Sequence, residues 1–103
     1  MISRKDFTFT IGYEGSVAVV DGAMKKRYGS LTPEQLAENR LYKQAVCSAV
    51  YEETSGGGSD QILQRVLQVY NQNASEKIGS VEELKRTFGV HAVPEGISRV
   101  TVI

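Results

Sequence analysis

Residues suited to catalysis are scarce in this chain of 103 residues, which has one histidine, His91, and one cysteine, Cys47. A single histidine cannot supply a two-histidine metal site or a histidine pair within one chain. A Cys47–His91 nucleophile pair requires the two side chains to meet in space, and no local motif around either residue supports it. Cys47 stands beside an apolar helical stripe, which favours a small buried hydrophobe. The sequence therefore predicts no catalytic residue, no cofactor-binding residue and no metal ligand.

Two other patterns can carry chemistry in proteins. Glu82 and Glu83 form a carboxylate pair, but they fall in a first helical turn, where acidic groups complement the helix dipole. Residues 56–58 are three consecutive glycines, and a glycine-rich run before a helix can hold a phosphate. The run lacks both the Gly-Lys-Ser/Thr sequence and the G-x-G-x-x-G spacing of known phosphate loops. We therefore interpret residues 54–59 as a mobile surface loop.

A basic run, Lys25, Lys26 and Arg27, is the candidate nucleic-acid contact, and Arg4 and Lys5 can extend it into a local patch. The alternative is that the run forms the cationic last turn of a short helix, where it complements the dipole. The 12 lysines and arginines equal the 12 aspartates and glutamates, so the chain has no net attraction to nucleic acid or anionic membrane. We therefore rank nucleic-acid binding as the second hypothesis.

Residues 80–90, SVEELKRTFGV, resemble the first helix and turn of a helix-turn-helix DNA-binding unit. The residues that carry the resemblance are Leu84, Phe88, Gly89 and Val90. The resemblance implies that a DNA-reading helix follows. That helix would run through residues 91–96, which contain the helix breakers Pro94 and Gly96. We interpret residues 80–90 as an ordinary capped helix.

The stretch from Leu31 to Tyr51 has the clearest helix signals in the chain. Thr32 as N-cap, Pro33 at the first helical position and Gln35 at the third form a capping box. An apolar stripe recurs at helical spacing further on, but it is not aligned with the start. The misalignment predicts a bend or break near Asn39.

The N-terminal part alternates apolar and polar residues from Phe7 to Tyr13, which predicts a strand. A second strand over residues 16–20 would complete a hairpin, with a helix beginning at Ser16 as the competing interpretation. A two-residue turn would pair Tyr13 with Ser16, Ile11 with Ala18 and Phe9 with Val20, all on one buried face. Asp21 would then cap a short helix that ends at Gly29.

Two further helices are predicted, one starting at Ser59 or Asp60 and one capped by Ser80 and ending at Gly89. Residues 97–103 alternate again and predict a C-terminal strand that pairs with the hairpin. The expected fold class is α+β: a small antiparallel sheet, made of the N-terminal hairpin and the C-terminal strand, covered by three to four helices. Residues 1–103 are expected to form a single domain.

The sequence favours a small protein-interaction or assembly module, a homo-oligomer or the binder of a protein partner. The C-terminal strand has one charge and no proline, so its edge is poorly protected against pairing. The candidate interface residues are Arg99, Val100, Val102 and Ile103. An enzyme is the least favoured class. No membrane-spanning segment is expected, and with one cysteine nothing points to secretion, so we expect a cytoplasmic protein.

Overall fold

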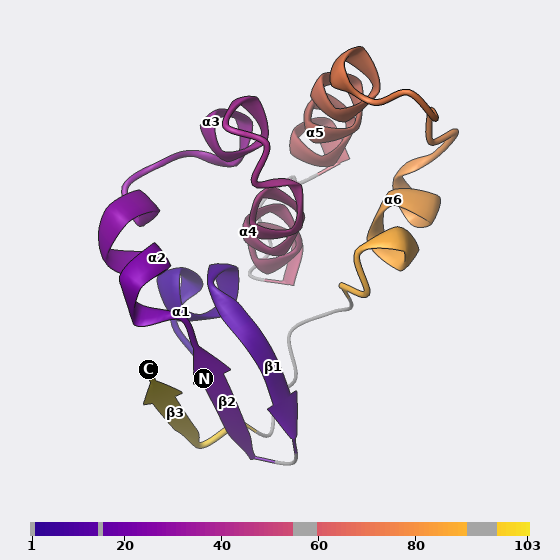
Figure 1. Cartoon of the computed structure of the whole chain (residues 1–103). Coiled ribbons are helices and arrows are strands. Elements are labelled where there is room, and N and C mark those ends of the chain that lie inside the picture. The colour runs from indigo at the N-terminus through magenta and orange to yellow at the C-terminus, as the bar shows by residue number, and fades with distance from the viewer. Residues whose placement is uncertain (1, 15, 55–59, 91–96) are drawn as a thin grey trace.

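The computed structural model describes residues 2–14, 16–54, 60–90 and 97–103, which contain six helices and three strands (Figure 1). In chain order they are α1 (Arg4–Thr8), β1 (Thr10–Glu14), β2 (Val17–Val20), α2 (Gly22–Tyr28), α3 (Pro33–Glu38), α4 (Tyr42–Thr54), α5 (Asp60–Asn73), α6 (Val81–Thr87) and β3 (Arg99–Val102). The predicted glycine-rich loop falls on residues outside this set, apart from the last residue of α4. The same is true of residues 91–96, where the helix-turn-helix resemblance requires its second helix.

The first element is a helix, so the prediction of a strand from Phe7 onward is wrong for residues 7–9. The Ser3 side chain accepts a hydrogen bond from the Asp6 backbone N–H and caps α1. The helix buries Phe7, and Phe9 at its C-cap is buried as well. The aromatic residues that suggested period two therefore reach the core from a helix and its end. Tertiary burial outweighs local strand propensity here.

The hairpin of β1 and β2 is confirmed, which decides the open question on residues 16–20 in favour of a strand. Its register differs from the prediction, because Tyr13 pairs with Ala18 rather than with Ser16. A bulge lies between Thr10 and Gly12, where the extra residue is Ile11. The predicted Ile11–Ala18 pair is therefore absent from the ladder, and Ile11 is largely exposed.

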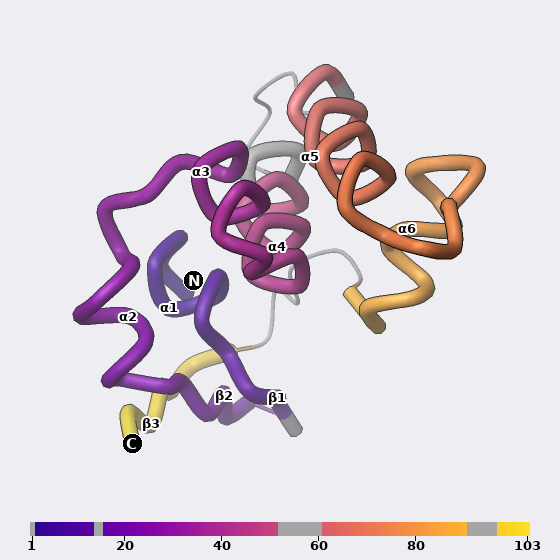
Figure 2. The backbone as a smooth tube through the Cα atoms, turned by 45° about the horizontal axis from the view of Figure 1, so that its top comes forward, coloured from indigo at the N-terminus to yellow at the C-terminus, as the bar shows by residue number. Residues whose placement is uncertain are grey.

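The third strand joins the hairpin as predicted, in the order β1-β2-β3, and the α+β class is confirmed. The sheet is mixed rather than antiparallel, because β3 runs parallel to β2, with Ala18 beside Val100 and Val20 beside Val102. A parallel neighbour requires a crossover connection, and the chain from α2 to α6 forms it. Figure 2 shows the sheet at the lower margin of the molecule with the helices above it.

The predicted break near Asn39 divides the 31–51 stretch into α3 and α4. The capping box at Thr32 and Gln35 starts α3 as predicted. At its end the Leu41 N–H donates to the Leu36 carbonyl, with Arg40 between them at a φ of 63°. This is a Schellman ending, in which a left-handed residue satisfies the last helical carbonyls. It reorients the chain before α4 begins.

Helix α4 is the centre of the core and packs against α1, α3 and α5. Its small residues Ala45 and Ala49 are fully buried, as are Val46 and Val50 on the same helix. The small side chains allow neighbouring helices to approach closely. The rings of Tyr42, Tyr70 and Phe88 contact one another and connect α4, α5 and the end of α6. One continuous core thus runs from α1 to α6.

Candidate functional site

One face of the sheet is apolar and uncovered, and we call it the open face. Its residues, together with Gly12 and Tyr13, line a hollow of about 580 Å³. The open face consists of Ile11, Val17, Val19 and Ile103. Ile11 is 54% exposed and Ile103 is 68% exposed, whereas Ala18 and Val20, which alternate with Val17 and Val19 along β2, are fully buried. The two sides of one strand thus have similar side chains and opposite surroundings.

The outer edge of β3 offers unpaired backbone groups, and we call it the β3 edge. The Arg99 N–H donates to the Ser16 carbonyl, and the Ile103 N–H donates to the Val20 carbonyl. Because backbone groups alternate in direction along a strand, the N–H and C=O groups of Val100 and Val102 point away from β2. In the described part of the sheet no strand lies beyond β3.

The predicted interface residues therefore lie together at one margin of the sheet. Arg99, Val102 and Ile103 are exposed, and Val100 is half-buried against the core. The sequence missed the open face, because the expected register placed Ile11 on the buried side. The available signal was the unbroken apolar run of β2, Val17 to Val20. Such a run is typical of a strand that is covered on both faces.

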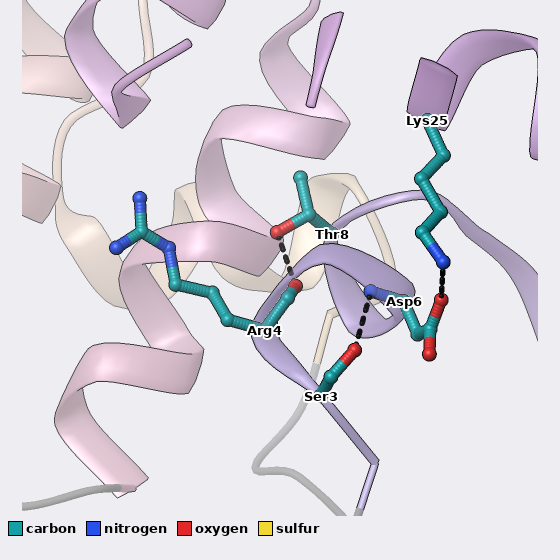
Figure 3. A network of polar contacts seen from close by, with 5 residues as sticks. All are labelled: Ser3, Arg4, Asp6, Thr8 and Lys25. Carbon is teal, nitrogen blue, oxygen red and sulfur yellow. Dashed lines mark hydrogen bonds and ion pairs between the residues drawn. The ribbon is translucent and has the colours of Figure 1, made fainter. Parts of the chain in front are cut away.

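The three residues of the predicted basic run have different surroundings. The Lys25 Nζ lies 2.6 Å from the Asp6 Oδ1, an ion pair that joins α2 to α1 (Figure 3). The Arg27 guanidinium lies over the ring of Tyr28, 5.4 Å from its centre. Lys26 is exposed. No local pattern could pair Asp6 with Lys25, since 19 residues separate them.

Three lysines meet in a second hollow, which we call the basic groove. It has a volume of about 400 Å³ and lies between α1, α2 and the end of β3. Its lining is Lys5, Gly22, Lys25, Lys26, Gly29, Ser30 and Val102. Two residues of the predicted basic run, Lys25 and Lys26, therefore share one site with Lys5, and Arg27 is not among the lining residues.

Asp6 is the acidic partner beside this groove. Burial acts to raise the pKa of its carboxyl, but hydrogen bonds with Lys25 and Ser3 and the charge of Lys25 act in the opposite direction. The net result is a pKa below the ordinary value of an aspartate. Asp6 is therefore ionised at neutral pH and neutralises Lys25.

Cys47 is buried, as predicted, with 2% of its surface exposed. Burial raises the pKa of its thiol to about 11, and the nearby charge of Lys43 offsets only part of that rise. A thiol with this pKa is protonated at neutral pH and is a poor nucleophile. His91 lies outside the described residues, so a Cys47–His91 pair stays an untested possibility.

Among the residues that the structure describes, no three His, Cys, Asp or Glu side chains are grouped so that they could hold a metal ion. In the same part of the chain, no helix has both the length and the apolar character needed to cross a membrane. The chain matches no family model, and no curated protein or solved structure is significantly similar to it. The function must therefore be argued from the surfaces themselves.

Proposed function

We propose that this protein is a small assembly module that associates with further copies of itself through its sheet. The observation that supports the proposal is where the exposed large apolar side chains lie. In the described part of the chain they are Ile11, Tyr13, Val102 and Ile103, and all of them belong to the sheet or directly follow its last strand. Exposed apolar residues gathered on one element are typical of a contact surface.

The composition of β2 supports the same proposal. Its four residues are all apolar, although this chain buries only Ala18 and Val20 completely and leaves Val17 and Val19 partly exposed. Val17 and Val19 lie on the open face beside Ile11 and Ile103. A sheet with one solvated face usually alternates apolar with polar residues, whereas this strand has the composition of a strand covered on both sides. A second layer supplied by another copy would complete that environment.

The β3 edge supplies the first contact, an antiparallel pair between β3 and β3 of the partner subunit. Val100 and Val102 hold the outward groups, so one register uses all of them. In it Val100 lies opposite Val102 of the partner subunit and Val102 lies opposite the partner's Val100. The two-fold axis passes beside Thr101 and is perpendicular to the sheet. Each pair exchanges two hydrogen bonds, and registers shifted by two residues leave part of these groups unpaired.

This register also separates the charges. Each Arg99 lies opposite Ile103 of the partner subunit, so the two guanidinium groups are four residues apart along the strands. Four residues correspond to about 13 Å. That distance exceeds the screening length of about 8 Å at physiological salt, so repulsion between the two Arg99 side chains is weak. The exposed Val102 is meanwhile covered by the partner's Val100.

The open face supplies the second contact. Pairing of such short strands covers too little surface on its own, because stable interfaces bury about 1,200 Å² or more. A two-fold axis perpendicular to the sheet keeps both open faces on the same side, where they form one six-stranded apolar layer. Two such layers packed face to face at about 10 Å give a four-copy sandwich. The edge contact and the face contact together thus bury more surface than either contact does alone.

A proline substitution on β3 tests this assembly. Val102→Pro removes an outward N–H and leaves the ladder to β2 intact, because proline is tolerated where the N–H faces away from the sheet. Thr101→Pro is the matched control, since the Thr101 N–H points toward β2. We expect light scattering to give about four times the monomer mass for the unchanged protein and at most twice the monomer mass for Val102→Pro, in which only the face contact remains.

The free energy of unfolding distinguishes Val102→Pro from Thr101→Pro. Val102→Pro should unfold at nearly the same urea concentration as the unchanged chain at low protein concentration. Thr101→Pro should lose about 1–3 kcal/mol, because a carbonyl of β2 loses its donor. A protein that stays monomeric at every concentration, or a Val102→Pro variant that keeps the full mass, would contradict the proposal. Nucleic-acid binding through Lys25, Lys26 and Arg27 stays a separate prediction, which salt-dependent binding of mixed DNA would test.

A further inference from the structure

We infer that the basic groove between α1, α2 and the end of β3 binds the phosphate group of a small phosphorylated molecule. The inference does not depend on self-association. It starts from the composition of the lining, which contains three lysines and one serine and neither aspartate nor glutamate. Lysines brought together from two helices outnumber the one acidic side chain beside them, Asp6, and create a local positive potential in a chain of zero net charge.

The charges in the groove are unequal. Asp6 neutralises Lys25 through the 2.6 Å ion pair, and its carboxylate is held in that position by α1 (Figure 3). Lys5 and Lys26 are exposed and have no ion-pair partner among the described residues. Asp6 therefore leaves two lysines of the groove unneutralised, and the other acidic group close by is the carboxyl of Ile103, whose oxygen accepts a hydrogen bond from the Gly22 N–H at 2.7 Å. The terminal phosphate of a monoester carries about 1.5 to 2 negative charges at pH 7, which matches the two lysines.

The shape of the groove depends on two glycines. A Cβ atom at Gly22 would lie 2.5 Å from a methyl carbon of Val102, and one at Gly29 would lie 2.4 Å from the Lys25 carbonyl oxygen. The same position at Gly29 is 3.6 Å from the Lys5 side chain, which places that lysine against the end of α2. The absence of side chains at both glycines lets α2 lie against β3 on one side and beside Lys5 on the other.

Size and donors define the ligand class. A volume of about 400 Å³ is in the lower part of the range of small-molecule sites, roughly 300–1,000 Å³. The donors are ammonium groups and the Ser30 hydroxyl, which suit phosphate oxygens approached from several directions. Val102 adds one apolar wall. A compact phosphorylated molecule fits this description better than a nucleic-acid strand, which would require a longer basic track.

The test is a titration of the full chain, labelled with nitrogen-15, with inorganic pyrophosphate at constant ionic strength. We expect amide shifts confined to residues of the groove, above all Lys26, Gly29 and Ser30, with saturable binding. The double variant Lys5→Gln/Lys26→Gln should weaken binding by about fivefold or more, as expected for the loss of two exposed charge contacts. Lys77→Gln is the matched control, since Lys77 is exposed and is not among the lining residues.

Two results would overturn the inference. One is a titration in which pyrophosphate moves no groove resonance, or in which Lys77→Gln weakens binding as much as the double variant does. The other is tight binding of a mixed-sequence single-stranded oligonucleotide without saturable binding of pyrophosphate. That second result would assign the lysines to a nucleic-acid backbone. Circular dichroism of each variant verifies that the fold is intact.

Discussion

The two faces of the central strand β2 differ in what covers them and hardly at all in composition. Ala18 and Val20 face the helices and have no exposed surface, while Val17 and Val19 face a hollow that is open to solvent. Both pairs are small and apolar. The difference in burial therefore does not come from the strand. It comes from the position of the helices, which lie above the sheet in Figure 2 and cover the side that Ala18 and Val20 face.

The two faces of β2 therefore have different roles: the covered face stabilises the fold, and the open face is available for association. Residues on the covered face contribute to folding, because their burial is complete within one chain. On the open face Val17 and Val19 are only partly buried and Ile11 and Ile103 are largely exposed, so this face keeps apolar surface for a later contact. The same substitution should therefore change the free energy of unfolding when it is made on the covered face, and the mass of the assembly when it is made on the open face. Neighbouring residues of one strand give the sharpest comparison.

The largest effect is expected from Val20→Asp. Val20 is fully buried, so the new carboxylate would be desolvated without a partner. The free energy of unfolding should fall by about 3–5 kcal/mol, a large share of the roughly 5–15 kcal/mol that stabilises a typical domain. Urea denaturation followed by circular dichroism measures it. A loss below 1 kcal/mol would mean that the covered face of β2 is open to water.

The next effect concerns the contact that fixes β3 beside α2. Gly22→Ala would normally stabilise a helix by about 1 kcal/mol. Here the added methyl group meets Val102 at 2.5 Å and the Ile103 carbonyl oxygen at 2.9 Å. We expect a net loss of about 1–3 kcal/mol, because the strand must shift. Thermal unfolding measures the change.

Gly79→Ala is the matched control for that substitution. Its new Cβ would have only one neighbour, the Glu83 side chain at the ordinary contact distance of 3.7 Å. We expect no loss of stability there, since an alanine in open space mainly restricts the unfolded chain. If both alanine variants gained stability, that result would contradict the close contact between Gly22 of α2 and Val102 of β3.

Local signals predicted the helix boundaries well, because each depends on a few neighbouring residues. The caps at Thr32, Asp21 and Ser80 are all present, and Gly89 ends α6 with a φ of 66°. Helix α1 was missed although its cap was available, since Ser3 is followed three residues later by an acidic residue. The alternation of large apolar residues after it gave a stronger signal for a strand.

The candidate sites could be predicted only in part, because they depend on where distant segments meet. The direction of β3 follows from the path of the chain through α2 to α6, which no local pattern determines. Lys5 joins Lys25 and Lys26 only because α1 lies beside α2. The open face requires the correct hairpin register, and the bulge at Ile11 changes it. The residue types thus indicated basic and apolar contact surfaces, but only the tertiary structure showed which residues share each surface.

A smaller effect is expected from the ion pair at the basic groove. The folded-state pKa of Asp6 is lowered, so its contribution to stability is present above the unfolded value of about 3.9 and is lost as the pH falls through the folded value. Asp6→Asn should therefore cost no more than about 1 kcal/mol at pH 7, and this difference from the unchanged chain should shrink below pH 4. Urea denaturation between pH 7 and pH 3 measures it. A difference that stays constant over this range would exclude the ion pair as its source.

The smallest effect on stability, with a large effect on assembly, is expected from Val19→Asp. Val19 is the neighbour of Val20 but is only half-buried on the open face, so a carboxylate there would still reach water in the isolated chain. The free energy of unfolding should change by about 0.5 kcal/mol or less at low protein concentration. In the four-copy sandwich the same carboxylate would be buried between two sheets, where it finds no partner. Light scattering should then give at most twice the monomer mass, because the edge contact survives and the face contact does not. An unchanged mass would exclude the open face from the assembly, while a loss of stability equal to that of Val20→Asp would show that the two faces of β2 are equally buried.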